Sequence, residues 1–101
     1  MVAMLYELVW TNRALKHLKK AHEHISKDSP KNALKVITEI AEAVEKALDN
    51  PEIYPADKYK IDNDGSYRAF EKHRYRIAFR FFQKTIRVLR VRHTGQEPKG
   101  Y

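Results

Sequence analysis

Arginines recur in the last third of the chain at spacings that would place them on one side of a β-strand. In residues 74–82, apolar side chains occupy alternate positions, and Arg74, Arg76 and Arg80 fall between them. Because successive side chains of a strand point to opposite sides of its sheet, one side would be core and the other a row of guanidinium groups. Arginine binds phosphate through two parallel hydrogen bonds, and nearby aromatic rings can stack on unpaired bases. The pattern therefore predicts a surface for single-stranded RNA.

The next stretch, residues 85–93, continues the basic pattern and ends in His93. Its alternation is less regular, because Arg87 falls on one side of the strand while Arg90 and Arg92 fall on the other. The sequence leaves the register of this strand open. An imidazole with an ordinary pKa of about 6.5 can act as an acid or a base, and it can equally be a structural or exposed side chain.

A solvated outer face is the alternative interpretation of these arginines, since antiparallel sheets ordinarily have one polar face. Glu71, Asp62 and Asp64 could pair with such a face. The charge distribution favours a partner instead. Residues 1–55 contain eight Lys/Arg and eight Asp/Glu, whereas residues 56–101 contain twelve and five, so the whole excess of +7 lies in the second half. Clustered cations attract polyanions such as nucleic acid, or an acidic protein.

Composition restricts the other chemistry. The chain has no cysteine, which excludes a disulfide framework, a thiolate metal site and a thiol nucleophile. His17, His22 and His24 do not have the i, i+4 spacing of a helical metal pair. We therefore expect no metal and no cofactor. The lack of a long apolar run predicts a cytoplasmic protein without a membrane span.

Two amphipathic helices are predicted to support the sheet. Residues 5–10 favour a strand that runs into Thr11, a helix cap, and apolar residues at helical spacing predict a helix to about residue 27. Ser29 before Pro30 begins a second helix, which ends near residue 48. Beyond a loop at 51–57, the remaining strands are predicted at 58–61, 66–71, 75–82 and 85–93.

These elements predict a single domain that spans residues 1–101. Without the short strand at 58–61, the order β-α-α-β-β-β indicates an α+β fold, in which a two-helix hairpin packs on one face of a small, mostly antiparallel sheet. The basic strands would form the other face.

The stretch SYRAFEKHRYRIAFRF, followed by IRVLRVRHTGQEPKGY, resembles the RelE/ParE family of bacterial toxins. TNRALKHLKK and NPEIYP extend the resemblance over nearly the whole chain. It implies a toxin of a type II toxin–antitoxin module, which a cognate antitoxin holds inactive by covering the basic groove. RelE-like members cleave messenger RNA on the ribosome, whereas ParE-like members inhibit DNA gyrase and cut nothing themselves.

Ribosome-dependent RNA cleavage without a metal is the leading hypothesis. The reaction needs a base for the ribose 2′-hydroxyl, cations around the phosphate and an acid for the leaving oxygen. The resemblance implies that Arg76 contacts the scissile phosphate, that Glu71 is the base, and that His93 is an acid or a base. Tyr101 would stack or relay a proton. The predicted phosphate-binding positions are Arg68, Lys72, Arg74, Arg90 and Arg92.

Two alternatives remain open, namely ParE-like inhibition of DNA gyrase and a basic RNA-binding module without catalysis. Thr94 stands where many RNA-cleaving relatives have an arginine, and the tail tyrosine comes later, after Pro98 and Gly100. A membrane partner is not expected. The antitoxin should carry an acidic segment, because it would face the basic half of the chain.

Overall fold

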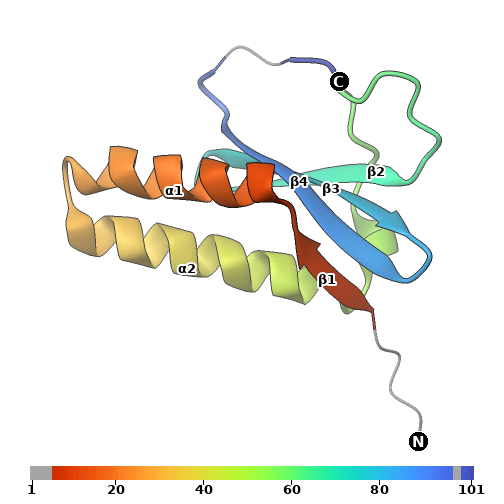
Figure 1. The fold of residues 1–101 in the computed structure, drawn as a ribbon, viewed down its shortest axis with the longest axis horizontal. Coiled ribbons are helices and arrows are strands. Elements are labelled where there is room, and N and C mark those ends of the chain that lie inside the picture. The colour runs from red at the N-terminus through yellow and green to blue at the C-terminus, as the bar shows by residue number, and fades with distance from the viewer. Residues whose placement is uncertain (1–5, 97–98) are drawn as a thin grey trace, which may run out of the picture.

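The computed structural model describes residues 6–96 and 99–101. Its elements confirm the predicted α+β order β-α-α-β-β-β (Figure 1). They are β1 (Glu7–Trp10), α1 (Asn12–Ser26), α2 (Pro30–Ala47), the 3-10 helix η1 (Pro51–Ile53), β2 (Tyr67–Lys72), β3 (Tyr75–Phe82) and β4 (Thr85–His93). Within the described residues, no helix combines the length and apolarity that crossing a membrane requires.

Both helices begin at the predicted caps. The Thr11 hydroxyl accepts a hydrogen bond from the backbone N–H of Ala14 at 3.1 Å and donates to the carbonyl of Val88 at 2.8 Å, which fastens the start of α1 to β4. Ser29 accepts from the N–H of Asn32 at 3.1 Å in the same way. Each cap satisfies a backbone N–H that has no partner inside its helix.

The sheet has the strand order β1-β4-β3-β2, with β1 parallel to β4 and the other pairs antiparallel. Residue 5, the first position of the predicted opening strand, lies outside the described residues. The predicted strand at 58–61 is wrong, because these residues form turns. The turns arise because the side chain of Asp57 accepts from the N–H of Tyr59 at 3.1 Å and its carbonyl accepts from the N–H of Lys60 at 3.1 Å.

The core lies between the helical hairpin and one face of the sheet. Ile77 and Phe79, at the predicted apolar positions of β3, are buried, and burying such a side chain stabilises the fold by about 1.5–3 kcal/mol. The larger cluster of buried residues comprises Ala14, Ala21, Val36, Ile40, Val44, Tyr75, Ile77, Val88 and Val91. Figure 1 shows the two helices side by side along this layer.

A β-bulge shifts the pairing of β3 and β4 by one residue. Ala78 lies opposite Arg90, and Phe79 lies opposite Val88, so Leu89 has no partner in the ladder. An extra residue of this kind reverses the in–out alternation of the strand beyond it. The irregular pattern of residues 85–93 follows from this bulge.

The bulge gathers the arginines of β4 on one side of the sheet. Arg87 lies opposite Arg80, and Arg92 lies opposite Arg76, while Arg90 joins them because it follows the bulge. Residues directly opposite each other share a face. We call this side the arginine face, and it is the side that the helices do not cover.

Candidate functional site

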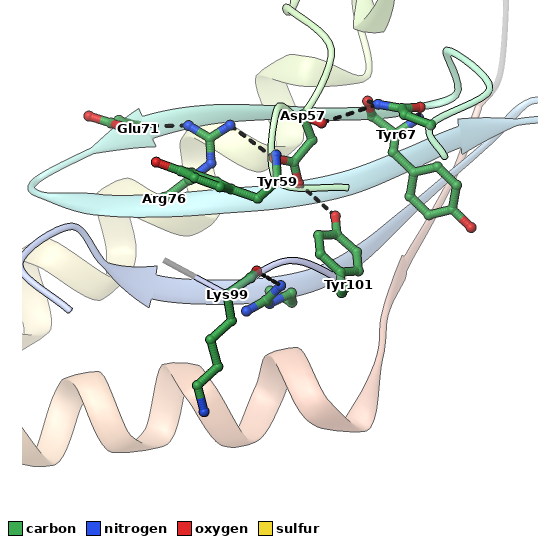
Figure 2. A network of polar contacts seen from close by, with 9 residues as sticks. Asp57, Tyr59, Tyr67, Glu71, Arg76, Lys99 and Tyr101 are labelled. Carbon is green, nitrogen blue, oxygen red and sulfur yellow. Dashed lines mark hydrogen bonds and ion pairs between the residues drawn. The ribbon is translucent and has the colours of Figure 1, made fainter. Parts of the chain in front are cut away.

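Asp57 lies at the centre of a polar network on the arginine face (Figure 2). Asp57 is buried, with 2% of its surface exposed to solvent. One carboxylate oxygen accepts hydrogen bonds from Nη2 of Arg76 at 3.0 Å and from the N–H of Tyr59 at 3.1 Å, and the other accepts from the hydroxyl of Tyr101 at 2.7 Å. Asp57 gives no periodic signal in the sequence, because it stands in a loop and two of its partners, Arg76 and Tyr101, come from distant positions.

The carboxylate of Asp57 is charged in this setting. Burial acts to raise its pKa, but the hydrogen bonds from Tyr101, Tyr59 and Arg76 outweigh burial, so the pKa lies below its ordinary value. The phenol of Tyr101 responds in the opposite direction, because burial and the neighbouring Asp57 carboxylate raise its pKa. Tyr101 is therefore a hydrogen-bond donor here and not a base.

Residues 99–101 fold back against the turn that follows Asp57. The N–H of Tyr101 donates to the carbonyl of Tyr59 at 3.1 Å, and the N–H of Ile61 donates to the carbonyl of Tyr101 at 2.7 Å. Packing here is close, since a Cβ added at Gly100 would lie 3.3 Å from the side chain of Ile61. Figure 1 shows this end of the chain beside the loop that leads into β2.

The tail also covers Arg90. The guanidinium carbon of Arg90 lies 4.5 Å from the centre of the Tyr101 ring, and its Nη1 donates to the carbonyl of Lys99 at 3.0 Å. Arg90 is 8% exposed, and burial, together with the nearby positive charge of Arg92, lowers its pKa. The cation–π contact and the carbonyl contact compensate in part for that burial.

A small surface pocket surrounds this network. Glu71 lies at its border, where its carboxylate is 3.7 Å from Nη1 of Arg76 and its side chain is 60% exposed. The pocket brings together six of the nine predicted site residues, which are Glu71, Arg76, Arg90, Arg92, His93 and Tyr101.

The ring of His93 nevertheless lies away from the arginine face. His93 is opposite Tyr75 in the ladder, and Tyr75 is buried in the core against the helices. The two rings meet edge-on with their centres 5.2 Å apart, and Nδ1 of His93 accepts from the N–H of Gly95 at 2.9 Å. Because neighbours in a strand alternate, His93 and Arg92 belong to opposite sides of the sheet.

Three predicted phosphate-binding residues do not meet at the pocket. Arg68 and Lys72 pair with the apolar positions of β3 and so lie on the other side of the sheet. Nη1 of Arg68 donates to the carbonyls of Glu52 at 3.0 Å and Tyr54 at 2.7 Å, at the end of η1. Arg74 is exposed in the turn between β2 and β3, with φ at 67°. Alternation along β2 therefore places Arg68 and Lys72 on the opposite side of the sheet from Arg76 and Arg92.

A family model and a solved structure show which known proteins this chain resembles. A model described as "ParE toxin of type II toxin-antitoxin system, parDE" matches residues 8–98. A solved structure of the chromosomal ParDE system from P. aeruginosa is 26% identical, with a TM-score of 0.68, over 90% of this chain and 98% of that chain. The YoeB dimer from Staphylococcus aureus is 15% identical, with a TM-score of 0.57 and the same coverage, and it supports the fold alone. No curated protein matches the sequence.

Proposed function

This chain belongs to the ParE toxin family of type II toxin–antitoxin systems, and from that premise we propose that it arrests growth by binding and inhibiting DNA gyrase without cutting RNA. It is the toxin of its module, and its cognate antitoxin is its partner. The sequence alone favours RNA cleavage over gyrase inhibition. The pairing of Arg76 with Asp57 is the observation that reverses this order.

Arg76 is the residue that cleavage would require at the scissile phosphate. Its guanidinium is already held by Asp57 at 3.0 Å and lies 3.7 Å from Glu71. Moving it to a phosphate would leave the buried Asp57 carboxylate without its cation, and breaking such a pair costs about 3 kcal/mol or more when it is fully buried. An arginine that two carboxylates already neutralise is a weak phosphate clamp.

The position of His93 supports the same conclusion. A general acid must lie within hydrogen-bond reach of the reacting oxygen. The His93 ring packs on Tyr75, on the helix-covered side of the sheet, whereas Arg76 and Arg92 lie on the arginine face. The phenol of Tyr101 is also committed, because its hydroxyl donates a hydrogen bond to the Asp57 carboxylate at 2.7 Å. Binding to a protein target needs none of these groups to be free.

Two assays on the same purified toxin test this proposal. We expect it to block DNA supercoiling by gyrase and to leave ribosome-bound messenger RNA intact. His93→Ala should retain inhibition, since no acid or base is involved. The proposal would be contradicted if the wild-type toxin cleaves the message, leaves supercoiling by gyrase normal, and loses the cleavage activity in Arg76→Ala.

RNA cleavage remains a second candidate, because one pocket is lined by two carboxylates and three guanidinium groups. Glu71, Arg76 and Arg92 all border it, and Nε of Arg76 has no hydrogen-bond partner among the described residues. If this pocket cleaves RNA, Glu71→Gln should lower the cleavage rate by about 100-fold, the usual effect of removing a general base. Primer extension on ribosome-bound message measures that rate. An unchanged rate in Glu71→Gln would remove Glu71 from the mechanism.

For the antitoxin, we propose that an acidic segment covers the arginine face in the cytoplasm. Arg87 is exposed on this face, so it is available to a carboxylate. Arg87→Gln should weaken the complex and reduce its dependence on salt, whereas Lys31→Gln on α2 should change neither. Titration calorimetry at several salt concentrations tests this. Equal effects of the two substitutions would contradict it.

A further inference from the structure

Helix α1 carries a positive charge that the balanced total of residues 1–55 conceals. It contains four Lys/Arg and one acidic residue, whereas α2 contains three of each. The four cations of α1 are all exposed, and they are Arg13, Lys16, Lys19 and Lys20. The helical hairpin therefore consists of one basic helix and one neutral helix.

The cations of α1 have no acidic partners within the part of the chain that the structure describes. The ion pairs there join His73 to Glu39, Arg76 to Asp57 and Glu71, and Arg80 to Asp64. None of them includes a lysine or arginine of α1. Such cations repel one another, and bound anions relieve that repulsion.

The positive charge continues from α1 to the end of β4. A groove between the two elements has no acidic residue in its lining, which includes His17, Lys20, His24, Arg92 and His93. A second hollow, on α1 itself, adjoins this groove, because His17 and Lys20 line both. We call Arg13, Lys16, Lys19, Lys20 and Arg92 the α1 band.

The charged residues that act on His17 are positive, and they affect the pKa of its imidazole. Burial is the largest cause of its lowered pKa, and the positive charges of Arg92, Arg90, Arg13 and Lys20 lower it further. Cations from both α1 and β4 therefore act on the same point. The α1 band therefore surrounds His17 from two elements, and Glu23 is the one acidic residue among the described residues that line the hollow on α1.

We propose that the α1 band binds the phosphate backbone of a nucleic acid, at a site centred on α1 that borders the pocket around Asp57 at Arg92. Arg13 and Lys20 are seven residues apart on α1, which is about 10 Å along the helix axis. A duplex strand presents a phosphate every 3.4 Å or so along its axis, so the band spans about three phosphates. Lysine and arginine contacts to phosphates position a nucleic acid without reading its sequence.

This inference goes beyond gyrase inhibition and holds for either candidate activity. A toxin that inhibits gyrase meets duplex DNA at its target, and one that cleaves message on the ribosome meets RNA. Both polymers present the same phosphodiester groups. The experiment separates them by using each as a probe.

The test compares two triple variants of the full chain. Arg13→Gln/Lys16→Gln/Lys20→Gln removes three of the five charges of the α1 band, and Lys31→Gln/Lys35→Gln/Lys46→Gln removes the same number of positive charges from α2. Fluorescence anisotropy measures the affinity of each for a random-sequence DNA duplex and for a single-stranded RNA of equal length, over a series of salt concentrations. Thermal melting verifies that each variant is folded.

We expect the α1 triple variant to bind at least about tenfold more weakly at low salt. Its slope of log affinity against log salt should fall by about 2 to 3 on the duplex, at about 0.9 per lost phosphate contact. The α2 triple variant should change little. If the toxin binds the DNA duplex and the single-stranded RNA with different affinities, the one bound more tightly identifies the kind of nucleic acid that the α1 band binds. Either result supports the proposal.

Two results would overturn it. Equal losses in both triple variants would mean that net charge acts, and not the band. Polyglutamate serves as a model of an acidic protein. If the α1 triple variant keeps its affinity for both nucleic acids but loses its affinity for polyglutamate, the α1 band binds an acidic protein instead. Supercoiling and cleavage assays on the same variants are separate readouts, so failure of the proposed function would be recognised independently.

Discussion

The two faces of the sheet are held by different interactions. On the helix-covered face, many apolar side chains are buried, including Ile77 and Val88 at 0% exposure. On the arginine face, one buried carboxylate, Asp57, joins Arg76, Tyr101 and the backbone of the intervening turn. Apolar burial is spread over many side chains and depends little on pH or salt, whereas a polar network depends on each of its members.

This difference explains what substitutions should do on each side. Removing an apolar side chain from the core costs the free energy of that side chain and of the cavity left behind. Removing Asp57 would leave Arg76 and Tyr101 without their shared acceptor. The following four changes test that contrast, and the expected effects become smaller from the first to the last.

The largest loss of stability is expected from Phe79→Ala on the core face. Phe79 is 1% exposed, so the change should lower the free energy of unfolding by about 3–5 kcal/mol. Phe82→Ala in the same strand is the matched control, because Phe82 is 48% exposed. Urea denaturation of both variants gives the comparison. Similar losses at the two positions would show that the core is misplaced.

Asp57→Asn should give the next largest loss. The change removes the charge that pairs with Arg76, whose side chain is 20% exposed, so we expect about 2–3 kcal/mol, less than for a fully buried pair. Asp64→Asn is the control, since Asp64 pairs with Arg80 at an exposed position and should contribute little. Urea denaturation distinguishes the two. If Asp57→Asn unfolds at the same urea concentration as wild type, the network does not stabilise the fold.

Tyr101→Phe should have a smaller effect, because it removes one hydrogen bond. Loss of the 2.7 Å hydrogen bond to Asp57 should lower the free energy of unfolding by about 1 kcal/mol. It should also loosen the contact of residues 99–101 with the turn that follows Asp57. Since the N–H of Ile61 donates to the carbonyl of Tyr101, its hydrogen exchange should become faster. Tyr59→Phe removes a hydroxyl that makes no hydrogen bond within the described residues, and it serves as the control. Unchanged exchange at Ile61 in Tyr101→Phe would count against a fastened tail.

The smallest effect should be a pH dependence at His17, where α1 meets β4. Nδ1 of His17 accepts from the N–H of Val91 at 3.0 Å, which protonation at this nitrogen would prevent. Because the folded chain lowers the pKa of His17, the unfolded chain binds the proton more readily. The stabilisation is therefore complete above the ordinary pKa of about 6.5 and is lost as pH falls toward the lowered value.

Melting temperatures measured across this pH range provide the test. His17→Gln should flatten the dependence, and His22→Gln, at an exposed position of the same helix, should leave it unchanged. If the melting temperature of His17→Gln still depends on pH as in wild type, another group is responsible for the pH dependence.

Several elements could be predicted because their signals are local. Thr11 and Ser29 cap helices through bonds to residues three positions later, and the apolar alternation of residues 75–82 needs no knowledge of a partner strand. The prediction for residues 58–61 was wrong because the side chain of Asp57 forms a turn that the β-favouring residues after it do not reveal. This turn signal is as local as the caps, since Asp57 lies two positions before Tyr59, but it competes with the β-favouring residues that follow it.

The sequence by itself determined the α+β order, the apolar side of β3, the excess of positive charge in the second half and the resemblance that the family match confirms. Tertiary structure alone decided which arginines share a face, because the bulge at Leu89 depends on the pairing of β3 with β4. It also decided that Asp57 holds Arg76 and Tyr101 together, and that the His93 ring packs against Tyr75 at the border of the same pocket. The physical reason is that burial and hydrogen bonding join residues far apart in the chain, and periodicity in a sequence carries no record of such partners.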